Sequence, residues 1–346
     1  MTDSVKNMDS LRVGVIGAGS WGTALANVMA QKGFATELWA LEPDVKEQMD
    51  TTHENKLFLA GVPLSEKIGV SNDLLTVAKD KDLLILVVPS HFMRSTAEKI
   101  NDVIDPETIV VSASKGIENE TFQTMTQILT DVLTQIPKER IAAISGPSFA
   151  KEVGLGIPTA ITAASSSLDT AKFVQKAMNT PTFRMYAHDD PLGVELGGSI
   201  KNVIAIAAGI VDGLELGLNT RAALITRGLV EMRRLGAQMG ANPRTLDSLA
   251  GIGDMILTCT GSLSRNHSVG EQIGQGKKLA DILAGMHMVA EGVKTTKSVY
   301  ELAQKMNVDM PICTSIYKTL YEDLDPKEAV YTLMTRSLKE ELLDDA

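Results

Sequence analysis

The chain has 346 residues and a formal net charge of −10, from 33 Lys and Arg against 43 Asp and Glu. This charge disfavours nucleic acid and anionic membranes as main partners, because both bind basic surfaces. Hydrophobic residues make up 44% and charged residues 22%, which is typical of globular rather than disordered proteins. The chain has only two cysteines, no apolar run as long as a membrane span and no apolar core in its first ten residues. We therefore expect a cytoplasmic protein of about two domains, without a membrane span.

Short apolar runs alternate with helical patterns over the first 190 residues. This alternation predicts parallel strands joined by helices, in a doubly wound α/β sheet of the Rossmann type. The predicted strands are 11–16, 35–40, 83–88, 108–112, 141–145 and 159–164, and a helix is predicted at 23–31.

The pattern changes near residue 190, and no strand is predicted after it. The predicted helices are 192–213, 221–239, 279–283, 292–306, 315–320 and 327–333. We therefore expect an N-terminal extension (1–10), a dinucleotide-binding α/β domain (11–191) and an all-α substrate domain (192–346).

A glycine-rich segment follows the first predicted strand and opens the first predicted helix. Gly17 permits a tight turn, Gly19 lets a pyrophosphate approach the backbone, and Gly22 lets helix and strand pack closely. The N-terminus of the helix, at Ser20 and Trp21, supplies free N–H groups for the phosphates. A glycine turn without a ligand is the alternative.

The end of the second predicted strand bears on the choice between NAD and NADP. Glu42 lies 20 residues after Gly22, the usual offset for a carboxylate that binds the ribose hydroxyls. Leu41 precedes it, and neither neighbour of Glu42 is a cation that could hold a 2′-phosphate. These residues favour NADH, unless Glu42 merely starts a solvated loop.

Lys201 lies ahead of the apolar stretch VIAIAAGIV, so its helix is predicted to be buried. Burial and the nearby helix N-terminus both lower the pKa of a lysine, which could then give and take a proton at a carbonyl carbon. Equally, the side chain could extend to solvent from the end of the helix.

Three further segments carry candidate binding residues. Asp254 could orient Lys201, and the run Ser264, Arg265 and Asn266 suits a phosphate or a carboxylate. Further candidates follow predicted strands, where open α/β sheets bind ligands: Lys115, Gly146 and Ser148. A capped loop and ordinary turn chemistry are the alternatives. The five histidines show no metal-binding spacing, so no metal site is predicted.

Together, the motifs resemble those of bacterial NAD(P)-dependent glycerol-3-phosphate dehydrogenases over nearly the whole chain. They are VIGAGSWGTALA from Val15, the segment from Asn55 to Gly61, VPSH from Val88, SKGI from Ser114, ISGPSFAKEV from Ile144, LGGSIKNVIAIAAGIVDGL from Leu196, NTRAALITRG from Asn219, AGIGDMILTCT from Ala250, SRN from Ser264, and Glu291 with Gly292.

The resemblance implies reduction of dihydroxyacetone phosphate to sn-glycerol 3-phosphate with NAD(P)H, for phospholipid synthesis, by a homodimer without a metal. It implies that Lys201 is the proton donor. It implies these residues on the substrate side: Lys115, Gly146, Ser148, Asp254, Ser264, Arg265 and Asn266. It implies these on the cofactor side: Ser20, Trp21, Lys115, Ala150, Arg265, Val289 and Glu291.

Two other functions stay open at this point. The first is a related β-hydroxyacid or 6-phosphogluconate-type dehydrogenase, which also joins a Rossmann-like domain to a helical one. The second is a dinucleotide-binding sensor without catalytic activity. The chain also departs from many relatives, which carry Arg or His where it has Leu41.

Overall fold

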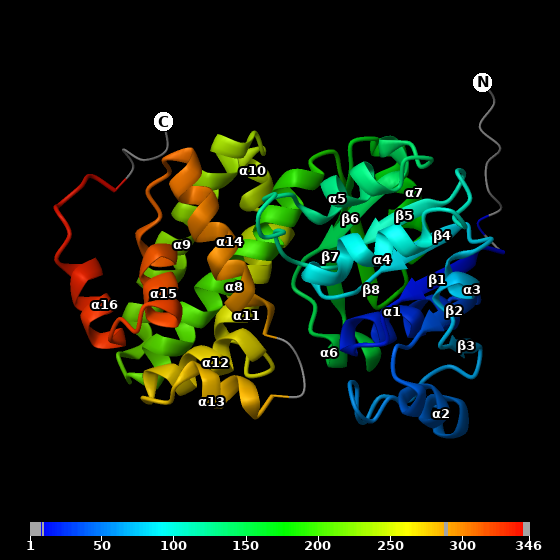
Figure 1. The fold of residues 1–346 in the computed structure, drawn as a ribbon, viewed down its shortest axis with the longest axis horizontal. Helices are drawn as coiled ribbons and strands as arrows, with labels where there is room; N and C mark the ends of the chain where they lie inside the picture. The colour runs from blue at the N-terminus through cyan, green and yellow to red at the C-terminus, as the bar shows by residue number, and fades with distance from the viewer. Residues whose placement is uncertain (1–7, 9, 287–289, 342–346) are drawn as a thin grey trace. The chain divides into compact units, whose positions relative to one another are not determined.

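The computed structural model describes Met8, residues 10–286 and residues 290–341. The chain divides into two compact units (Figure 1). The first unit takes in the chain up to Ser114 together with Met125–Pro191, and the second takes in Lys115–Thr124 together with the chain from Leu192 onward. The predicted ranges 11–191 and 192–346 contained no such exchange of a segment. Lys115 therefore belongs with the helical unit.

An eight-stranded sheet in the order β3-β2-β1-β4-β5-β6-β7-β8 forms the centre of the first unit. The chain moves outward from β1 in both directions, so the strand order reverses between β1 and β4. In open α/β sheets, ligands bind at the carboxyl ends of the strands at such a reversal. The strands are β1 (Arg12–Ile16), β2 (Ala35–Trp39), β3 (Ile68–Ser71), β4 (Leu83–Leu86), β5 (Ile109–Ser112), β6 (Ile141–Ser145), β7 (Thr159–Ser165) and β8 (Phe183–His188).

Six of these strands were predicted, and the expectation of a Rossmann-type doubly wound sheet is confirmed. The expectation of parallel pairing was wrong at one place, because β7 runs antiparallel to β6. Between them lie residues 146–158, whose only helix is the short α6 (Ala150–Gly154). The two strands that were not predicted, β3 and β8, lie at the edges of the sheet.

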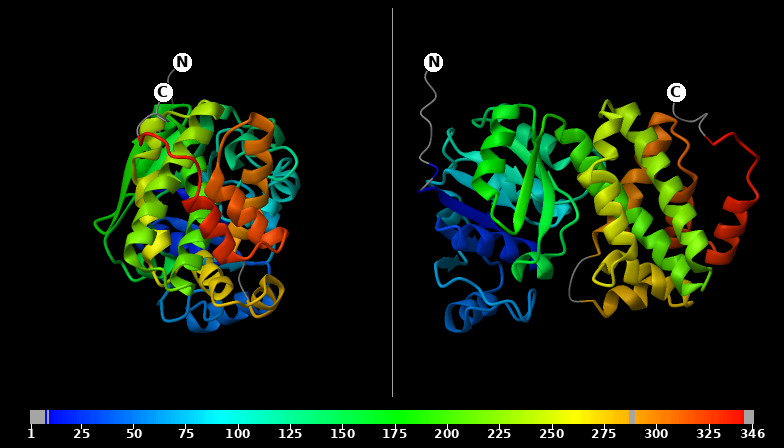
Figure 2. Two further views of the ribbon diagram at one scale, coloured as in Figure 1. Left: turned by 90° about the vertical axis from the view of Figure 1, so that its left-hand side faces the viewer. Right: turned by 180° about the vertical axis from the view of Figure 1, so that it is seen from behind.

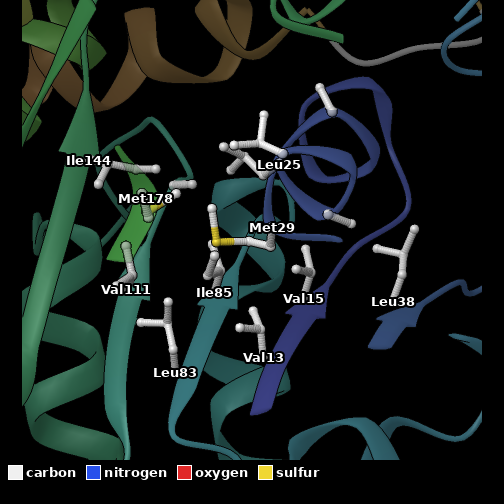
Figure 3. Packing of buried hydrophobic residues seen from close by; sticks show 14 of the residues in the cluster. Val13, Val15, Leu25, Met29, Leu38, Leu83, Ile85, Val111, Ile144 and Met178 are labelled. Atoms are coloured by element: carbon white, nitrogen blue, oxygen red, sulfur yellow. The ribbon is translucent and has the colours of Figure 1, made fainter. Parts of the chain in front are cut away.

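Helices cover both faces of the sheet, and alternate side chains of the strands enter two separate cores. Val13 and Val15 of β1 belong to one core, and Ile16 belongs to the other. Figure 3 shows Leu25 and Met29 of α1 packed over the first face. The helices of that core are α1 (Ser20–Gln31), α2 (Pro43–Thr52), α6 and α7 (Leu168–Met178), and those of the other are α3 (Leu74–Ala78), α4 (Met93–Ile100) and α5 (Met125–Val132).

Helices make up the second unit, as predicted, and no strand occurs among its described residues from Leu192 onward (Figure 2). They are α8 (Pro191–Gly213), α9 (Gly217–Met239), α10 (Pro243–Leu246), a π-helical turn (Leu249–Gly253), α11 (Asp254–Thr260), α12 (Arg265–Gly274), α13 (Leu279–Ala284), α14 (Glu291–Met306), α15 (Pro311–Tyr321) and α16 (Pro326–Met334).

The central helix of this unit is α8. By length and composition it could cross a membrane, but its apolar window is entirely buried within the structure. A helix that is apolar on all sides is also typical of the core of a large helical unit. Because α8 supplies much of this core, the polar side chains between Gly193 and Val211 on it are removed from water.

Candidate active site

The turn between β1 and α1 has the geometry of a dinucleotide-binding loop. Gly17 has a φ of +119°, and a Cβ there would lie 2.6 Å from the carbonyl oxygen of Val87. A Cβ on Gly22 would lie 1.9 Å from the carbonyl oxygen of Gly17. Packing alone therefore requires glycine at both positions.

Gly19 is different. It is the N-cap of α1, its φ of −67° and ψ of −179° suit any residue, and a Cβ would meet nothing within 4 Å. The fold therefore does not need glycine at this position. The space in front of the first turn of α1 is where the free N–H groups of a helix bind phosphate. The loop thus fits a dinucleotide cofactor, with Ser20 and Trp21 in the first helical turn.

The end of β2 carries the residues expected to choose between the two nicotinamide cofactors. Leu41 is 67% exposed, and Glu42 caps α2 without a side-chain capping hydrogen bond. Lys46, the first cation after them, pairs with Asp50 at 2.5 Å between Nζ and Oδ2. The local preference for NADH therefore stays a prediction.

Lys201 is buried in the second unit, and its side chain does not extend to solvent. Its ammonium nitrogen lies 2.8 Å from Oδ1 of Asp254 and 2.6 Å from Oγ1 of Thr258. The pKa of Lys201 is lowered to about 8, chiefly by burial; Asp254 opposes this shift, and the charge of Lys115 contributes to it. The lysine can therefore exist in both protonation states near neutral pH.

A second lysine shares the same carboxylate. Nζ of Lys115 lies 2.5 Å from Oδ2 of Asp254, whose side chain is almost completely buried. Two cations thus face one anion, which leaves a net positive charge to attract a phosphate ester or a developing oxyanion.

Lys115 enters the second unit at the start of Lys115–Thr124, a segment held against α8. The backbone N–H of Gly116 donates to Oγ of Ser199 at 3.0 Å. Oγ1 of Thr124 donates to Oε2 of Glu195 at 2.7 Å. These bonds fix both ends of the segment on the helix that carries Lys201.

Close backbone packing places Asp254 against Lys201. Gly197 lies one turn before Lys201 on α8, and a Cβ there would lie 2.5 Å from the carbonyl oxygen of Ala250. Ala250 belongs to the π-helical turn that leads into Asp254, and such turns often occur at functional sites. Thr258, which sequence reasoning missed, lies four residues after Asp254 and therefore on the same helical face.

The first turn of α12 carries the candidate phosphate-binding residues. Ser264 caps the helix, its Oγ accepting from the N–H of His267 at 3.2 Å. Oδ1 of Asn266 accepts from the N–H of Gly292 at 3.0 Å, and a Cβ on Gly292 would also meet the carbonyl oxygen of Asn202. The first turn of α12 is thus linked through Gly292 to Asn202, the residue next to Lys201. Partial burial lowers the pKa of Arg265, and Glu291 opposes this shift.

The other candidates belong to the first unit. Gly146 has a φ of +149°, and a Cβ there would lie 2.8 Å from Cα of Ile161, so packing explains this glycine. Ser148 donates to the carbonyl oxygen of Gly146 at 2.9 Å, and Ala150 begins α6. Val289 lies outside the described residues. In the described part of the chain, no group of three or more His, Cys, Asp or Glu side chains could hold a metal ion.

Two family models together match nearly the whole chain. The model of the NAD-dependent glycerol-3-phosphate dehydrogenase N-terminus matches residues 12–171, and that of the C-terminus matches residues 190–331. The chain belongs to the NAD-dependent glycerol-3-phosphate dehydrogenase family. This finding confirms the resemblance that the motifs indicated.

Individual members of this family match at high identity. Glycerol-3-phosphate dehydrogenase [NAD(P)+] of Syntrophobacter fumaroxidans is 53% identical over 330 residues, which cover 95% of this chain and 97% of the relative. The enzyme of the same name from Citrifermentans bemidjiense is 54% identical over 95% of this chain and 98% of its own. The crystal structure of glycerol-3-phosphate dehydrogenase from Coxiella burnetii is similar with a TM-score of 0.90 and 39% identity, over 94% of this chain and 99% of that one.

Proposed function

We propose that this chain catalyses the reversible reduction of dihydroxyacetone phosphate to sn-glycerol 3-phosphate with NAD(P)H. The observation that carries the proposal is the buried group of Lys201, Lys115 and Asp254, beside a helix N-terminus with an arginine in its first turn. A group of this kind suits a substrate with both a ketone and a phosphate.

Lys201 is the proposed proton donor to the ketone oxygen and the proton acceptor in the reverse direction. When bound, the nicotinamide cofactor supplies the hydride for the ketone carbon. The developing negative charge on the oxygen is stabilised by the ammonium group, which then gives up its proton. A pKa of about 8 suits both directions, because neither protonation state is rare near pH 7.5. Asp254 and Thr258 hold the nitrogen in place.

Binding of the phosphate is assigned to Arg265 and its neighbours. A guanidinium and a helix N-terminus both suit a phosphate dianion, and binding energy there orients the carbonyl group. The proposed residues on the substrate side are Lys115, Gly146, Ser148, Lys201, Asp254, Ser264, Arg265 and Asn266. Those on the cofactor side are Gly17, Gly19, Ser20, Trp21, Gly22, Lys115, Ala150, Arg265, Val289 and Glu291.

The remaining proposals follow from family membership. Reduction of dihydroxyacetone phosphate in the cytoplasm would supply the glycerol backbone of phospholipids, and a homodimer is the proposed assembly. Light scattering on the purified chain tests the dimer: a mass near 74 kDa supports it, and a mass near the 37.1 kDa of one chain contradicts it.

The deciding experiment follows the loss of nicotinamide absorbance with dihydroxyacetone phosphate, using NADPH and NADH in parallel. We expect oxidation that requires the phosphate, with unphosphorylated dihydroxyacetone as the control. The ratio of kcat/KM for the two cofactors reports the effect of Leu41 and Glu42. Cofactor binding without turnover would instead support a sensor, and turnover only with a carboxylate substrate would support a β-hydroxyacid dehydrogenase.

A further inference from the structure

Helices α8 and α12 pack with their backbones in contact. A Cβ on Gly209 of α8 would lie 2.0 Å from the carbonyl oxygen of His267, and one on Gly213 would lie 2.2 Å from that of Glu271. From the other side, a Cβ on Gly270 of α12 would lie 2.0 Å from the carbonyl oxygen of Ile206. Glycines on both helices thus permit an approach that any side chain would prevent. The first turn of α12 therefore lies close along the last turns of α8.

Asp212 stands at the end of this contact and joins three helices. Its Oδ2 lies 2.8 Å from Nε2 of His267 on α12 and 2.8 Å from Nη1 of Arg221 on α9. An ionised carboxylate only accepts hydrogen bonds, so Nε2 of His267 carries the proton. All three side chains are at least three-quarters buried, which limits screening of these contacts by water.

His267 is fixed from two sides. Its backbone N–H donates to Oγ of Ser264, the cap of α12, and its ring contacts Asp212. It directly follows Arg265 and Asn266, the residues assigned to the phosphate. Lys201 lies on the same helix as Asp212, eleven residues earlier, or about 16 Å along the axis. Asp212 therefore links the position of the phosphate-binding turn to the helix of the proton donor.

We propose that Asp212 is a positioning residue for the substrate phosphate, acting through His267 on the first turn of α12. The inference rests on the proposed function, which places the phosphate at that turn. Arg221 balances the charge of Asp212, so the carboxylate can orient His267 close to an anion site with less repulsion of the anion. In this proposal Asp212, His267 and Arg221 do not contact the reacting atoms.

The charge of Asp212 makes the test decisive. Removing a negative charge near an anion site should tighten phosphate binding if only electrostatics mattered. If Asp212 positions α12, the same change should weaken binding. Asp212→Asn keeps the size of the side chain, so the sign of the change in KM separates the two effects.

We expect Asp212→Asn to raise the KM for dihydroxyacetone phosphate about tenfold, with kcat within about twofold and the KM for the cofactor unchanged. The Ki of inorganic phosphate as a competitive inhibitor should rise in parallel. Asp309→Asn is the matched control, because it removes the same charge from an exposed pair with Arg336. An unchanged or lower KM in Asp212→Asn would overturn the inference.

A second pair of variants tests the same link without changing Asp212. His267→Gln keeps a side-chain N–H donor and should stay near the wild-type KM, whereas His267→Ala should show the increase. The double variant Asp212→Asn/His267→Ala should be no worse than Asp212→Asn alone, because both changes break the contact between Asp212 and His267. Equal KM values for His267→Gln and His267→Ala would contradict the proposal even if Asp212→Asn failed to fold. If wild-type protein does not oxidise cofactor with dihydroxyacetone phosphate, the proposed function fails instead.

Discussion

Asp254 is the residue on which the candidate site depends most. It is almost completely buried, and each of its two oxygens faces a different lysine. A buried carboxylate is stable in its charged form only when it is paired. Here the pairing also holds the ammonium groups of Lys115 and Lys201 on the two oxygens of one carboxylate. Removal of either lysine should therefore change the chemistry of the other.

Replacement of Lys201 tests the proton donor. Lys201→Ala should lower kcat for ketone reduction by at least about 100-fold, because a general acid is lost from the transition state. The Kd of the cofactor should change little. Lys318→Ala, which removes an exposed lysine from α15 of the same unit, is the control. Steady-state kinetics and cofactor titration give both values. Near-normal turnover in folded Lys201→Ala would remove this lysine from the mechanism.

The pH dependence of the reaction tests the coupling of the two lysines. Ketone reduction needs protonated Lys201, so kcat should fall as pH rises through about 8, whereas glycerol 3-phosphate oxidation should rise over the same range. The charge of Lys115 lowers the pKa of Lys201, so Lys115→Met should move the inflection to higher pH. Lys297→Met, an exposed substitution on α14, should leave the inflection in place. An inflection that Lys115→Met leaves in place, or moves to lower pH, would contradict the coupling.

Among the elements, the start of α1 contains two glycines that are present for different reasons. Gly22 is required by contact with Gly17, whereas nothing in the fold occupies the space beside Gly19. A structural requirement and a binding requirement therefore lie three residues apart. Sequence reasoning expected close packing at Gly22 and approach of a pyrophosphate at Gly19. The structure shows the close packing at Gly22, and the space beside Gly19 is open, as the second role requires.

Alanine variants separate these roles. Gly19→Ala should fold with nearly wild-type stability and raise the cofactor Kd at least about tenfold, because its Cβ occupies space next to the phosphate site. Gly22→Ala should lower the free energy of unfolding by about 2 kcal/mol or more through collision with the backbone. Fluorescence titration and urea unfolding measure the two quantities. Unchanged cofactor affinity in Gly19→Ala would place the phosphates elsewhere.

A buried acid joins two other helices of the second unit. Glu231 of α9 accepts hydrogen bonds from the backbone N–H groups of Ile312 and Cys313 in the first turn of α15, at 3.0 Å for Cys313. Burial raises the pKa of Glu231 to about 7, despite these bonds. The carboxyl group accepts hydrogen bonds from N–H groups at the start of α15, which have no partner within that helix. The same group binds a proton near neutral pH.

This shift predicts a pH dependence of stability. The unfolded chain releases the Glu231 proton near pH 4.5 and the folded chain near pH 7, so folding binds a proton between these values. The free energy of unfolding should therefore fall as pH rises through this window, by roughly 3 kcal/mol in total from this group. The difference between wild type and Glu231→Gln in urea unfolding isolates the effect. Glu322→Gln on the surface is the control, and a difference that is constant with pH would contradict the prediction.

For the whole molecule, the cores were the most predictable part. The run at β4 is buried on both faces, so its apolar residues alone identify it. The edge strand β8 alternates buried Phe183 and Met185 with exposed Arg184 and Tyr186, a period-two signal that was present but short. The antiparallel pairing of β7 with β6 was not predicted, because the direction in which two strands pair is not carried by the apolar pattern of either strand.

For the site residues too, local features could be predicted from the sequence and contacts between distant residues mostly could not. The burial of the helix that carries Lys201 could be predicted from its apolar residues, whereas the sequence left open whether the lysine side chain reaches solvent. Asp254 was named from the sequence as a residue that could orient Lys201, and its Oδ1 lies 2.8 Å from Nζ of that lysine. The contact of Lys115 with the same carboxylate was not predicted, since Lys115 and Asp254 are 139 positions apart and meet only through packing on α8. Thr258 and the link from Asp212 to His267 were missed for this reason.

Hydrogen exchange tests the assignment of the phosphate to one turn of the second unit. Glycerol 3-phosphate alone should slow exchange of the amides in the first turn of α12, because the helix N-terminus and Arg265 are its proposed ligands. Glycerol, which lacks the phosphate, should leave them unchanged. Equal protection by both compounds, or none by either, would place the phosphate elsewhere.

The segment Lys115–Thr124 also has a consequence for synthesis on the ribosome. It leaves the first unit after Ser114 and returns at Met125, but the helix that it packs on begins only at Pro191. Domains generally fold as they emerge, N-terminal part first. The α/β sheet can therefore close before the helix on which this ten-residue segment packs has been made. Lys115 reaches its carboxylate only after Asp254 has been translated, so the site assembles after all the strands of the α/β sheet have been synthesised.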